Sequence, residues 1–552
     1  MLIKNFYTIA LLALLVLIFF SCNKGGESPL FTKLSSKQSG IYFNNIIENN
    51  FKFNALNYPL FYNGAGVGIG DINNDGLPDL FFAGNKVSSR LYLNKGNMQF
   101  KDVTESAGVA TNKWITGVSI VDINNDNFLD IYLSVVSTEF DPPDSRRNLL
   151  FINNGDTTFT ESAKAYGLDD PSFTTHATFL DYNKDGHLDV FLLNHSPGAF
   201  YYDMAGQESK IKDQSPSYDR LYRNNGDGSF TNVSKEAGIL ETLGYGLGVV
   251  VADFNRNKWP DIYVSNDLLP DDVLYINNKD GSFTNKASEY LKHTSSTGMG
   301  VDAADFDNDG WTDLLQVDMM PRDYKERKVK SGIIDYNYFS SMLDKGYGYT
   351  YSQNSFQWHR GIDHTGDLIF SEIGRLAGVA YTEWSWAALF GDYNNDGLKD
   401  ILVSNGYPKD VNNYDYLMKV NDVRGLRTNQ DIKRYRYQIL KKLQAIKSPN
   451  YLFKNNGGLE FSNISQRWGF RESSFSYGAA HGDLDNDGDL DIVINNINAL
   501  ASIYQNNSSA PEGNHYLLVT LEGDSLNRQG IGTTLTLTSE GQKQYAYQTL
   551  WR

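Results

Sequence analysis

Five carboxylates lie within nine residues in the stretch Asp483-Leu-Asp-Asn-Asp-Gly-Asp-Leu-Asp491. Carboxylates this close together repel one another unless a cation lies among them. The EF-hand calcium loop also begins D-x-D-x-D-G, but it requires a bidentate glutamate at its twelfth position. Ile494 occupies that position here. The stretch is therefore not an EF-hand, and Asp491 at its ninth position is the candidate closing carboxylate.

This stretch is one of seven copies of the pattern D-x-[DN]-x-[DN]-x-x-x-D, which we call acidic loops 1 to 7 in chain order. Any single copy could be an Asx-rich turn, but seven copies in register indicate a repeated site. The candidate ligand side chains at positions one, three, five and nine are Asp71, Asn73, Asp75 and Asp79; Asp122, Asn124, Asp126 and Asp130; Asp181, Asn183, Asp185 and Asp189; Asp253, Asn255, Asn257 and Asp261; Asp305, Asp307, Asp309 and Asp313; Asp392, Asn394, Asp396 and Asp400; and Asp483, Asp485, Asp487 and Asp491.

The donor set favours calcium. The ligand positions carry only oxygen donors, with no Cys or His, which argues against zinc. With the backbone carbonyl of position seven, each loop offers five oxygens, which suits calcium better than the strict octahedron of magnesium. Acidic loops 5 and 7 have four carboxylates each and should bind best. Acidic loop 4 keeps two carboxylates and has Lys258 in place of glycine, so we expect a weak or empty site there. The sequence thus predicts up to six or seven structural Ca²⁺ ions.

The flanks of the acidic loops predict the elements that position them. A short Gly- or Ala-rich apolar segment precedes each loop and a strand-like run follows it, which indicates a β-hairpin. A second hairpin module, for example RLYRNNGDGSF (220–230), alternates with the first. Two hairpins make the four strands of one propeller blade. We therefore expect an all-β, seven-bladed propeller over residues 40–507, in which residues 40–53 supply the missing outer part of the seventh blade.

These loops and flanks resemble FG-GAP/VCBS repeats, the calcium-binding blades also found in integrin α-subunit propellers. The resemblance covers residues 40–507 and implies the calcium-stabilised hairpin loops described above. Residues 515–552 resemble the start of an ASPIC/UnbV domain through NRQGIGTTLTL (527–537). Such a β module follows propellers in cartilage acidic protein-like families, so this segment is interpreted as a partial C-terminal module.

The N-terminus, MLIKNFYTIALLALLVLIFFSC, is typical of an exported protein. Lys4 precedes an uncharged apolar run that is too short for a spanning helix and suits an export signal. The single cysteine of the chain, Cys22, ends the run, and this arrangement resembles the lipobox of bacterial lipoproteins. We expect a signal peptide over 1–21, lipidation of Cys22, a tether over 22–39 and attachment to the outer membrane of the bacterial cell envelope. An ordinary cleaved signal is the alternative.

Long insertions at 316–380 and 405–450 interrupt the later blades. The second insertion predicts a helix that either packs on the propeller rim or presents a docking surface. The aromatic-rich segment between Tyr347 and Trp358 is likewise either rim packing or a platform for stacking sugars. The apolar face of the predicted helix consists of Ile432, Tyr435, Ile439, Leu443 and Ile446.

The net charge of −17 argues against a nucleic-acid binder, which would need a basic face. No Glu pair or His/Tyr/Arg cluster interrupts the repeats, so we assign no catalytic residue. We expect a calcium-stabilised envelope lipoprotein that binds protein or glycan without catalysis, as an accessory of an outer-membrane complex. The alternative is a propeller hydrolase or lyase acting on envelope or extracellular polysaccharide. Such an enzyme would need converging acid–base groups in a cleft. Two carboxylates outside the acidic loops, ~5–9 Å apart in a cleft, would favour it.

Overall fold

The structure is a computed structural model of the chain. The predicted signal peptide (1–21), Cys22 and the start of the tether lie outside the residues it describes. Across the described part of the chain, each helix is too short or too polar to cross a bilayer. The described residues are 29–138, 141–196, 215–268, 270–330, 336–508, 516–523, 526–539 and 542–550.

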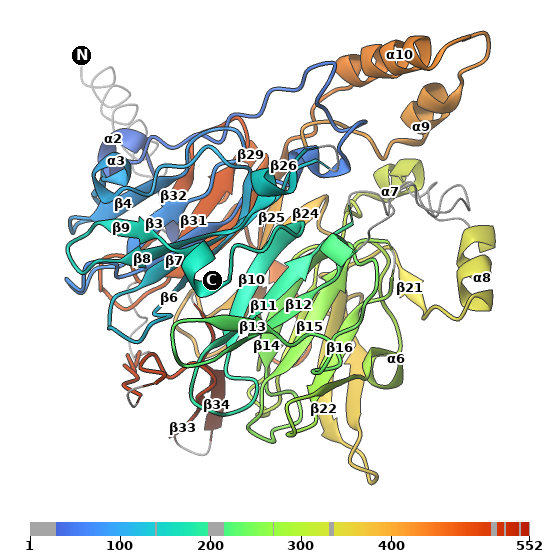
Figure 1. Ribbon diagram of the computed structural model, residues 1–552. Helices are drawn as coiled ribbons and strands as arrows, with labels where there is room; N and C mark the ends of the chain where they lie inside the picture. The colour runs from blue at the N-terminus through green and yellow to red at the C-terminus, as the bar shows by residue number, and fades with distance from the viewer. Residues whose placement is uncertain are drawn as a thin grey trace, which may run out of the picture.

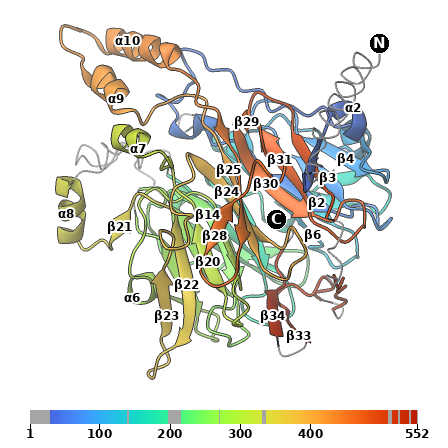
Figure 2. The same cartoon turned by 180° about the vertical axis from the view of Figure 1, so that it is seen from behind.

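Seven four-stranded antiparallel sheets are arranged around a common axis (Figure 1, Figure 2). Each sheet is one blade, and neighbouring blades contact each other through their innermost strands. In every blade the acidic loop joins the innermost strand to the second strand. The predicted all-β, seven-bladed propeller is confirmed, because each predicted pair of hairpins forms one blade.

The first four blades each use four consecutive strands. They are β2 (Val67–Gly70), β3 (Asp79–Phe82), β4 (Arg90–Asn94) and β5 (Phe100–Asp102); β6 (Ile115–Val121), β7 (Asp130–Val135), β8 (Leu149–Asn153) and β9 (Phe159–Glu161); β10 (Thr174–Leu180), β11 (Asp189–Asn194), β12 (Arg220–Asn224) and β13 (Phe230–Asn232); and β14 (Gly246–Ala252), β15 (Asp261–Asn266), β16 (Val273–Asn277) and β17 (Phe283–Asn285).

Insertions separate the strands of the later blades, and the seventh blade borrows its outer strand from the N-terminus. The strands are β19 (Val301–Ala304), β20 (Asp313–Gln316), β22 (Ser355–Ile362) and β23 (Leu368–Glu372); β24 (Ser385–Gly391), β25 (Asp400–Asn405), β27 (Tyr451–Asn455) and β28 (Phe461–Asn463); and β30 (Ser476–Gly482), β31 (Asp491–Asn496), β32 (Ser502–Asn506) and β1 (Phe31–Leu34).

The second strand of each blade is buried along its whole length. A strand that is covered on both faces has consecutive apolar residues, whereas a half-exposed strand alternates apolar and polar ones. This explains why runs such as ILVSN follow the acidic loops. Seven clusters of buried apolar side chains fill the spaces between neighbouring blades. The core is therefore a ring, and it is complete only when the seventh blade is.

The strand that closes the ring differs from the expected one. β1 pairs antiparallel with β32, from Phe31 opposite Asn506 to Leu34 opposite Ile503. It lies within the predicted tether, so the tether boundary at residue 39 is wrong. Residues 40–53 form only isolated bridges, at Asn44 and Asn45, and the side chains of Ile41, Phe43 and Ile47 pack into the core instead. The prediction placed the closing strand in this segment because the motif GIYFNN (40–45) resembles the second hairpin module.

The insertions carry helices, as expected for the later blades. Helix α10 ends at Lys442, so Leu443 and Ile446 lie beyond the predicted helical face. Its only buried side chain is that of Leu440, because the α9–α10 hairpin projects away from the propeller (Figure 1). The insertion helices are α7 (Tyr324–Lys330), α8 (Tyr336–Asp344), α9 (Tyr414–Asn421) and α10 (Asn429–Lys442). The short elements are α2 (Ser36–Ser39), α3 (Thr104–Ala107), α4 (Ala163–Tyr166), α6 (Ala287–Tyr290), η1 (Pro59–Tyr62), η2 (Pro143–Arg146), η3 (Ser215–Ser217), β18 (Thr294–Ser295), β21 (Thr350–Tyr351), β26 (Ser448–Pro449) and β29 (Ser473–Ser474).

The two ends of the central channel differ. At the end away from the acidic loops, η1 joins a buried aromatic cluster that includes Phe61, Tyr407 and Tyr477. At the acidic-loop end lies the C-terminal hairpin, β33 (Thr534–Ser539) and β34 (Gln542–Tyr547). Thr549 and Leu550 follow this hairpin and line the channel together with residues of the innermost strands. The acidic-loop face is thus already occupied by the chain's own C-terminal segment.

Candidate metal centres

All seven acidic loops share one backbone scaffold, centred on the aspartate at position one. In acidic loop 7 the two carboxylate oxygens of Asp483 accept the backbone N–H groups of Asp487 (3.0 Å) and Gly488 (2.9 Å). Gly488 has a φ of +93°, which a side chain rarely tolerates. The chain therefore turns tightly around the first carboxylate and brings the next side chains of the loop towards it.

The aspartate at position nine ties each loop to the next hairpin of its blade. The Asp491 carboxylate accepts the N–H groups of Leu484 (2.9 Å) and Asn506 (2.8 Å). All seven position-nine side chains make this pair of bonds and are 0% exposed. Burial raises the pKa of Asp491 to about 8. The position-nine residue is thus a structural clamp in addition to a candidate ligand.

Acidic loops 5 and 7, those with four carboxylates, bring three of them together. Carboxylate oxygens of positions one, three and nine lie within 4.8 Å of one another in both loops; the residues are Asp305, Asp307 and Asp313, and Asp483, Asp485 and Asp491. The position-five residues lie outside these two groups, because each accepts the backbone N–H of position seven, as Asp309 does from Trp311 (2.8 Å). Burial, with the nearby carboxylates of Asp309 and Asp307, raises the pKa of Asp305 to about 7.

The donor set of acidic loop 7 fits a cation. Asp485 Oδ1 is buried and has no hydrogen-bond partner among the described residues, and a buried unpaired oxygen is costly. In acidic loops 1, 2, 3 and 6 the asparagine at position three instead donates to the aspartate at position five, for example Asn73 Nδ2 to Asp75 Oδ2 (3.0 Å). At position three, these four loops therefore have a side-chain N–H donor, whereas loops 5 and 7 have a carboxylate that can only accept.

Acidic loop 4 keeps the scaffold, and its arginine at position four points to the neighbouring loop and to the C-terminal hairpin. Asp261 accepts the N–H of Phe254 (3.0 Å), and Asp253 accepts that of Lys258 (2.7 Å), as in the other loops. The Arg256 guanidinium lies over the rings of Trp311 (5.2 Å) and Tyr545 (5.7 Å). The loop conformation thus forms without a full carboxylate set.

Two further residue positions link the loops into a ring, and the sequence analysis assigned them no role. The asparagine that ends the third strand donates to a loop of the preceding blade in five blades, for example Asn94 Nδ2 to Leu484 O (2.7 Å). The asparagine at position four donates to the next loop in four cases, including Asn486 Nδ2 to Gly76 O (2.9 Å) across the seam. The recurring Asn-Asn pairs of both hairpin modules were the available signal.

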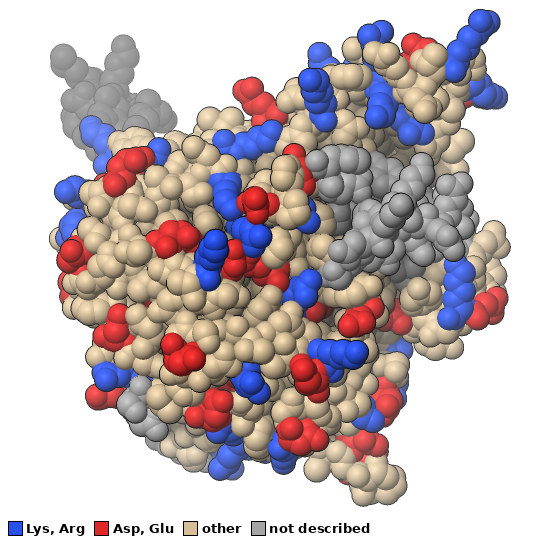
Figure 3. Space-filling model, viewed as in Figure 1, with Lys and Arg blue, Asp and Glu red and all other residues tan. Residues whose placement is uncertain are grey.

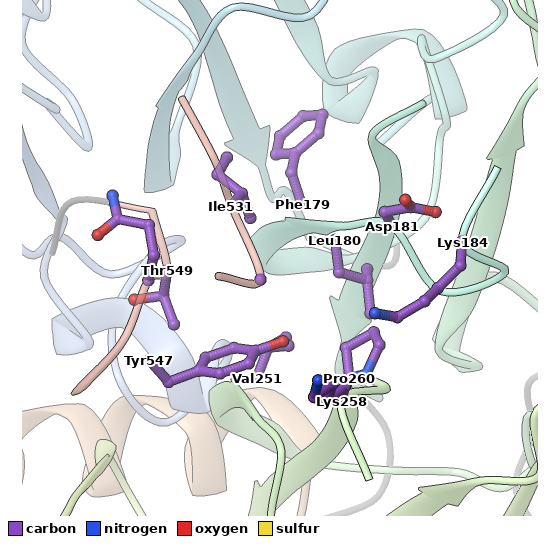
Figure 4. A pocket seen from close by; sticks show the side chains of 12 residues that line it. Phe179, Leu180, Asp181, Lys184, Val251, Lys258, Pro260, Ile531, Tyr547 and Thr549 are labelled. Atoms are coloured by element: carbon purple, nitrogen blue, oxygen red, sulfur yellow. The ribbon is translucent and has the colours of Figure 1, made fainter. Parts of the chain in front are cut away.

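The C-terminal hairpin is seated on the acidic-loop face. Figure 4 shows Ile531, Tyr547 and Thr549 on one side of a small pocket and Lys184 and Lys258 on the other. Further contacts reach neighbouring loops, including Gln544 Nε2 to Gly397 O (3.3 Å). The identity of residues 515–552 as a partial module remains a prediction, but their described part covers the loops.

The aromatic-rich insertion lies on the rim. Tyr351 stacks on Phe339 of α8 (5.9 Å) and packs edge-on against His293 (4.9 Å). Trp358 Nε1 donates to Asp307 Oδ2 (2.8 Å). These contacts favour rim packing over a sugar-stacking platform.

Comparisons with known proteins agree with this architecture. The FG-GAP-like repeat family matches residues 38–133, 135–192, 211–264 and 265–315, which contain acidic loops 1 to 5. Cartilage acidic protein 1 of Homo sapiens is 33% identical over 115 residues, and that of Xenopus tropicalis is 35% identical over 91 residues. These matches cover 20% and 16% of this chain, and only 16% and 14% of the two relatives.

Two solved structures show distant similarity. An Agrocybe aegerita lectin that recognises non-reducing terminal N-acetylglucosamine is 15% identical over 79% of this chain and 86% of its own, with a TM-score of 0.37. Bacillus licheniformis rhamnogalacturonan lyase PL11 is 11% identical over 82% of this chain and 73% of its own, with a TM-score of 0.37. The repeat matches and the seven blades together support an FG-GAP repeat protein built of propeller blades.

Proposed function

We propose that this protein is a calcium-stabilised lipoprotein of the bacterial cell envelope that binds protein or glycan without catalysing a reaction, as an accessory of an outer-membrane complex. The observation that carries the non-enzymatic part is the composition of its clefts. Each of the three described clefts contains at most one carboxylate: Asp181 at the acidic-loop face, Asp141 at the opposite face, and none in the channel. Hydrolysis of a glycosidic bond typically uses a pair of carboxylates.

Calcium has a structural role in this proposal. The carboxylate groups of acidic loops 5 and 7 would hold the ion most strongly, and the ion would neutralise charges that the scaffold forces together. The loops differ in carboxylate number chiefly at position three. Loops 5 and 7 have Asp307 and Asp485 there, whereas loops 1, 2, 3, 4 and 6 have asparagine. The C-terminal hairpin covers this face, which leaves little room there for a substrate.

The anchor and the ring closure are neighbours in sequence. The eight residues between Cys22 and Phe31 can span at most about 30 Å. A lipid at Cys22 would therefore hold the seventh blade close to the membrane, while the α9–α10 hairpin lies at the top of the propeller and β33–β34 at the bottom (Figure 1, Figure 2).

The test uses the intact protein in a bacterial host that processes lipoproteins. We expect incorporation of a palmitate analogue, loss of the label in Cys22→Ala, and co-purification of the wild type with an outer-membrane protein or glycan. An unlabelled wild type would overturn the anchor. Release of shorter or unsaturated products from envelope polysaccharide would overturn the non-enzymatic function in favour of a hydrolase or lyase.

A further inference from the structure

A cleft of about 750 Å³ lies on the face opposite the acidic loops, and neither the repeats nor the metal centres account for it. It is bounded by the segment after the N-terminal strand, by the ends of blades 1 and 2, and by helix α10. Its size falls in the range of small-ligand sites. The lining residues are Lys52, Phe53, Leu56, Asn57, Lys86, Trp114, Ser137, Thr138, Asp141 and Lys433.

The cleft is positively charged in an acidic protein. Lys52, Lys86 and Lys433 line it against one carboxylate, Asp141. All three lysines are exposed, and none has an ion pair within 4.0 Å among the described residues. The surrounding insertion has the same bias, with ten Lys and Arg against four Asp over residues 409–447, although the whole chain has a net charge of −17.

The charge is visible on the surface. Lys and Arg side chains gather over the α9–α10 hairpin at the top right of Figure 3, whereas acidic side chains are spread over the body of the propeller. Such a local concentration of one sign attracts ligands of the opposite sign and speeds their encounter. An anionic ligand is therefore the class that the electrostatics favour.

The floor of the cleft is aromatic and well supported. The Trp114 ring packs edge-on against Phe53 (5.3 Å) and Tyr58 (5.8 Å). The Lys86 ammonium lies 3.9 Å from the centre of the Phe53 ring. Trp114 and Phe53 are only partly buried, so both contribute apolar surface to the cleft. A sugar ring presents the complementary C–H face.

Helix α10 forms one wall of the cleft, and contacts about one helical turn after Lys433 hold it against the propeller. Tyr437 packs edge-on against Phe51 (5.6 Å), and its hydroxyl donates to Asn49 Oδ1 (3.4 Å). Lys433 lies four residues before Tyr437 and therefore on the same side of the helix. The helix that projects into solvent is thus attached to the propeller at the point where it completes the cleft.

Groups that can recognise hydroxyls also line the cleft. Ser137 Oγ and Thr138 Oγ1 both donate to Asp141 Oδ2 (2.5 Å and 2.8 Å). Because both hydroxyl protons are donated to Asp141, the oxygens of this group are available as acceptors for the hydroxyl groups of a ligand. Sugar hydroxyl groups can donate to these acceptors, whereas the side chains of an acidic peptide have no hydroxyl donors, which favours a saccharide.

We propose that this cleft binds an acidic saccharide, whose carboxylate or sulfate contacts Lys86 and Lys433 and whose ring packs against Trp114. The assignment rests on the proposed function, because it names the ligand class of a non-enzymatic binding module. It also gives the insertion that forms α9 and α10 a specific role, which is to complete a ligand site on the face left open by the C-terminal hairpin.

The experiment measures binding by titration calorimetry with two acidic probes, an oligogalacturonate and a sulfated carrageenan oligosaccharide. Their methyl-esterified and desulfated counterparts are the uncharged controls. We expect at least one acidic probe to bind in preference to its control, with an affinity that falls as ionic strength rises. Lys86→Gln and Lys433→Gln should each weaken binding by about ten-fold or more. A ten-fold loss corresponds to roughly 1.4 kcal/mol of binding free energy. Lys441→Gln, on α10 but outside the cleft, should leave it unchanged.

Several outcomes would overturn the assignment. They are binding of neither acidic probe, equal binding of charged and uncharged probes, equal loss in Lys441→Gln, or tighter binding of an oligoglutamate peptide. Melting temperatures of the variants show whether a loss reflects misfolding. If the intact protein still captures an envelope partner while the Lys86 and Lys433 variants match the wild type, the cleft assignment fails and the proposed function stands. If it captures nothing, the proposed function fails as well.

Discussion

Acidic loops 7 and 4 have the same backbone but differ in charge, because loop 7 carries five aspartates whereas the two aspartates of loop 4 are balanced by Arg256 and Lys258. In both, position one accepts two backbone N–H groups and position nine clamps the loop to the next hairpin. Loop 7 gathers three carboxylates and leaves Asp485 Oδ1 buried without a partner, whereas loop 4 places Arg256 between two aromatic rings. The loop fold is therefore set by backbone hydrogen bonds, and the affinity for a cation that we propose is set by the carboxylates that the fold brings together.

The two blades also differ in how they are completed. Blade 4 consists of four consecutive strands, and blade 7 depends on β1 from the other end of the chain. Phe31 of β1 is 1% exposed and packs against Tyr393, Trp468 and Phe470. Loop 7 thus lies in the one blade whose assembly is also the closure of the ring.

The largest expected effect comes from Phe31→Ala. Truncating a buried aromatic side chain costs about 3–5 kcal/mol of unfolding free energy, and here it also weakens the closing strand. The matched variant is Phe283→Ala in β17, the outer strand of blade 4, which is 5% exposed. Hydrogen exchange should show loss of protection in β32 for Phe31→Ala, while Phe283→Ala affects β16 and leaves β32 protected. Equal protection of β32 in both variants would contradict closure by β1.

The next effect tests the shared scaffold. Asp261→Ala and Asp491→Ala each leave two buried backbone N–H groups without their acceptor, which costs about 2–4 kcal/mol. With a calcium chelator present, denaturant unfolding should give similar losses for the two variants, although only one belongs to a predicted strong site. A loss confined to Asp491→Ala would mean that the position-nine residue acts only as a metal ligand.

A smaller effect tests the contact between loop 4 and the C-terminal hairpin. Arg256→Gln removes two cation–π contacts, which together are worth about 1 kcal/mol at a partly exposed site. We expect the C-terminal hairpin to become more accessible, with faster proteolysis around Tyr545 and no change in calcium binding. Lys235→Gln, which changes an exposed lysine after the outer strand of blade 3, is the control. An unchanged cleavage rate would show that Arg256 does not hold the hairpin.

The repeat pattern was sufficient to predict the blades, because seven copies with continuous apolar runs admit few other arrangements. It could not locate β1, since a four-residue strand such as FTKL carries too short an alternation to distinguish it from a linker. The pattern also could not show that the carboxylate at position five accepts the backbone N–H of position seven in its own loop, as Asp309 does. That hydrogen bond depends on the folded backbone and has no signature in the sequence. The cleft between α10 and blades 1 and 2 was equally beyond reach, since Lys86 and Lys433 are far apart in the chain.

The central claim is that carboxylate number, on a shared scaffold, decides which loops use calcium. The most direct test is the rise in melting temperature on adding calcium to chelator-treated protein, measured for the wild type, Asp485→Ala and Asn255→Ala. Both variants truncate position three, in loops 7 and 4 respectively. A site saturated to about 100 times its dissociation constant stabilises by roughly 2.7 kcal/mol. Asp485→Ala should lose a corresponding part of the rise, and Asn255→Ala should retain all of it. An equal rise in both variants, or no rise in the wild type, would contradict the claim.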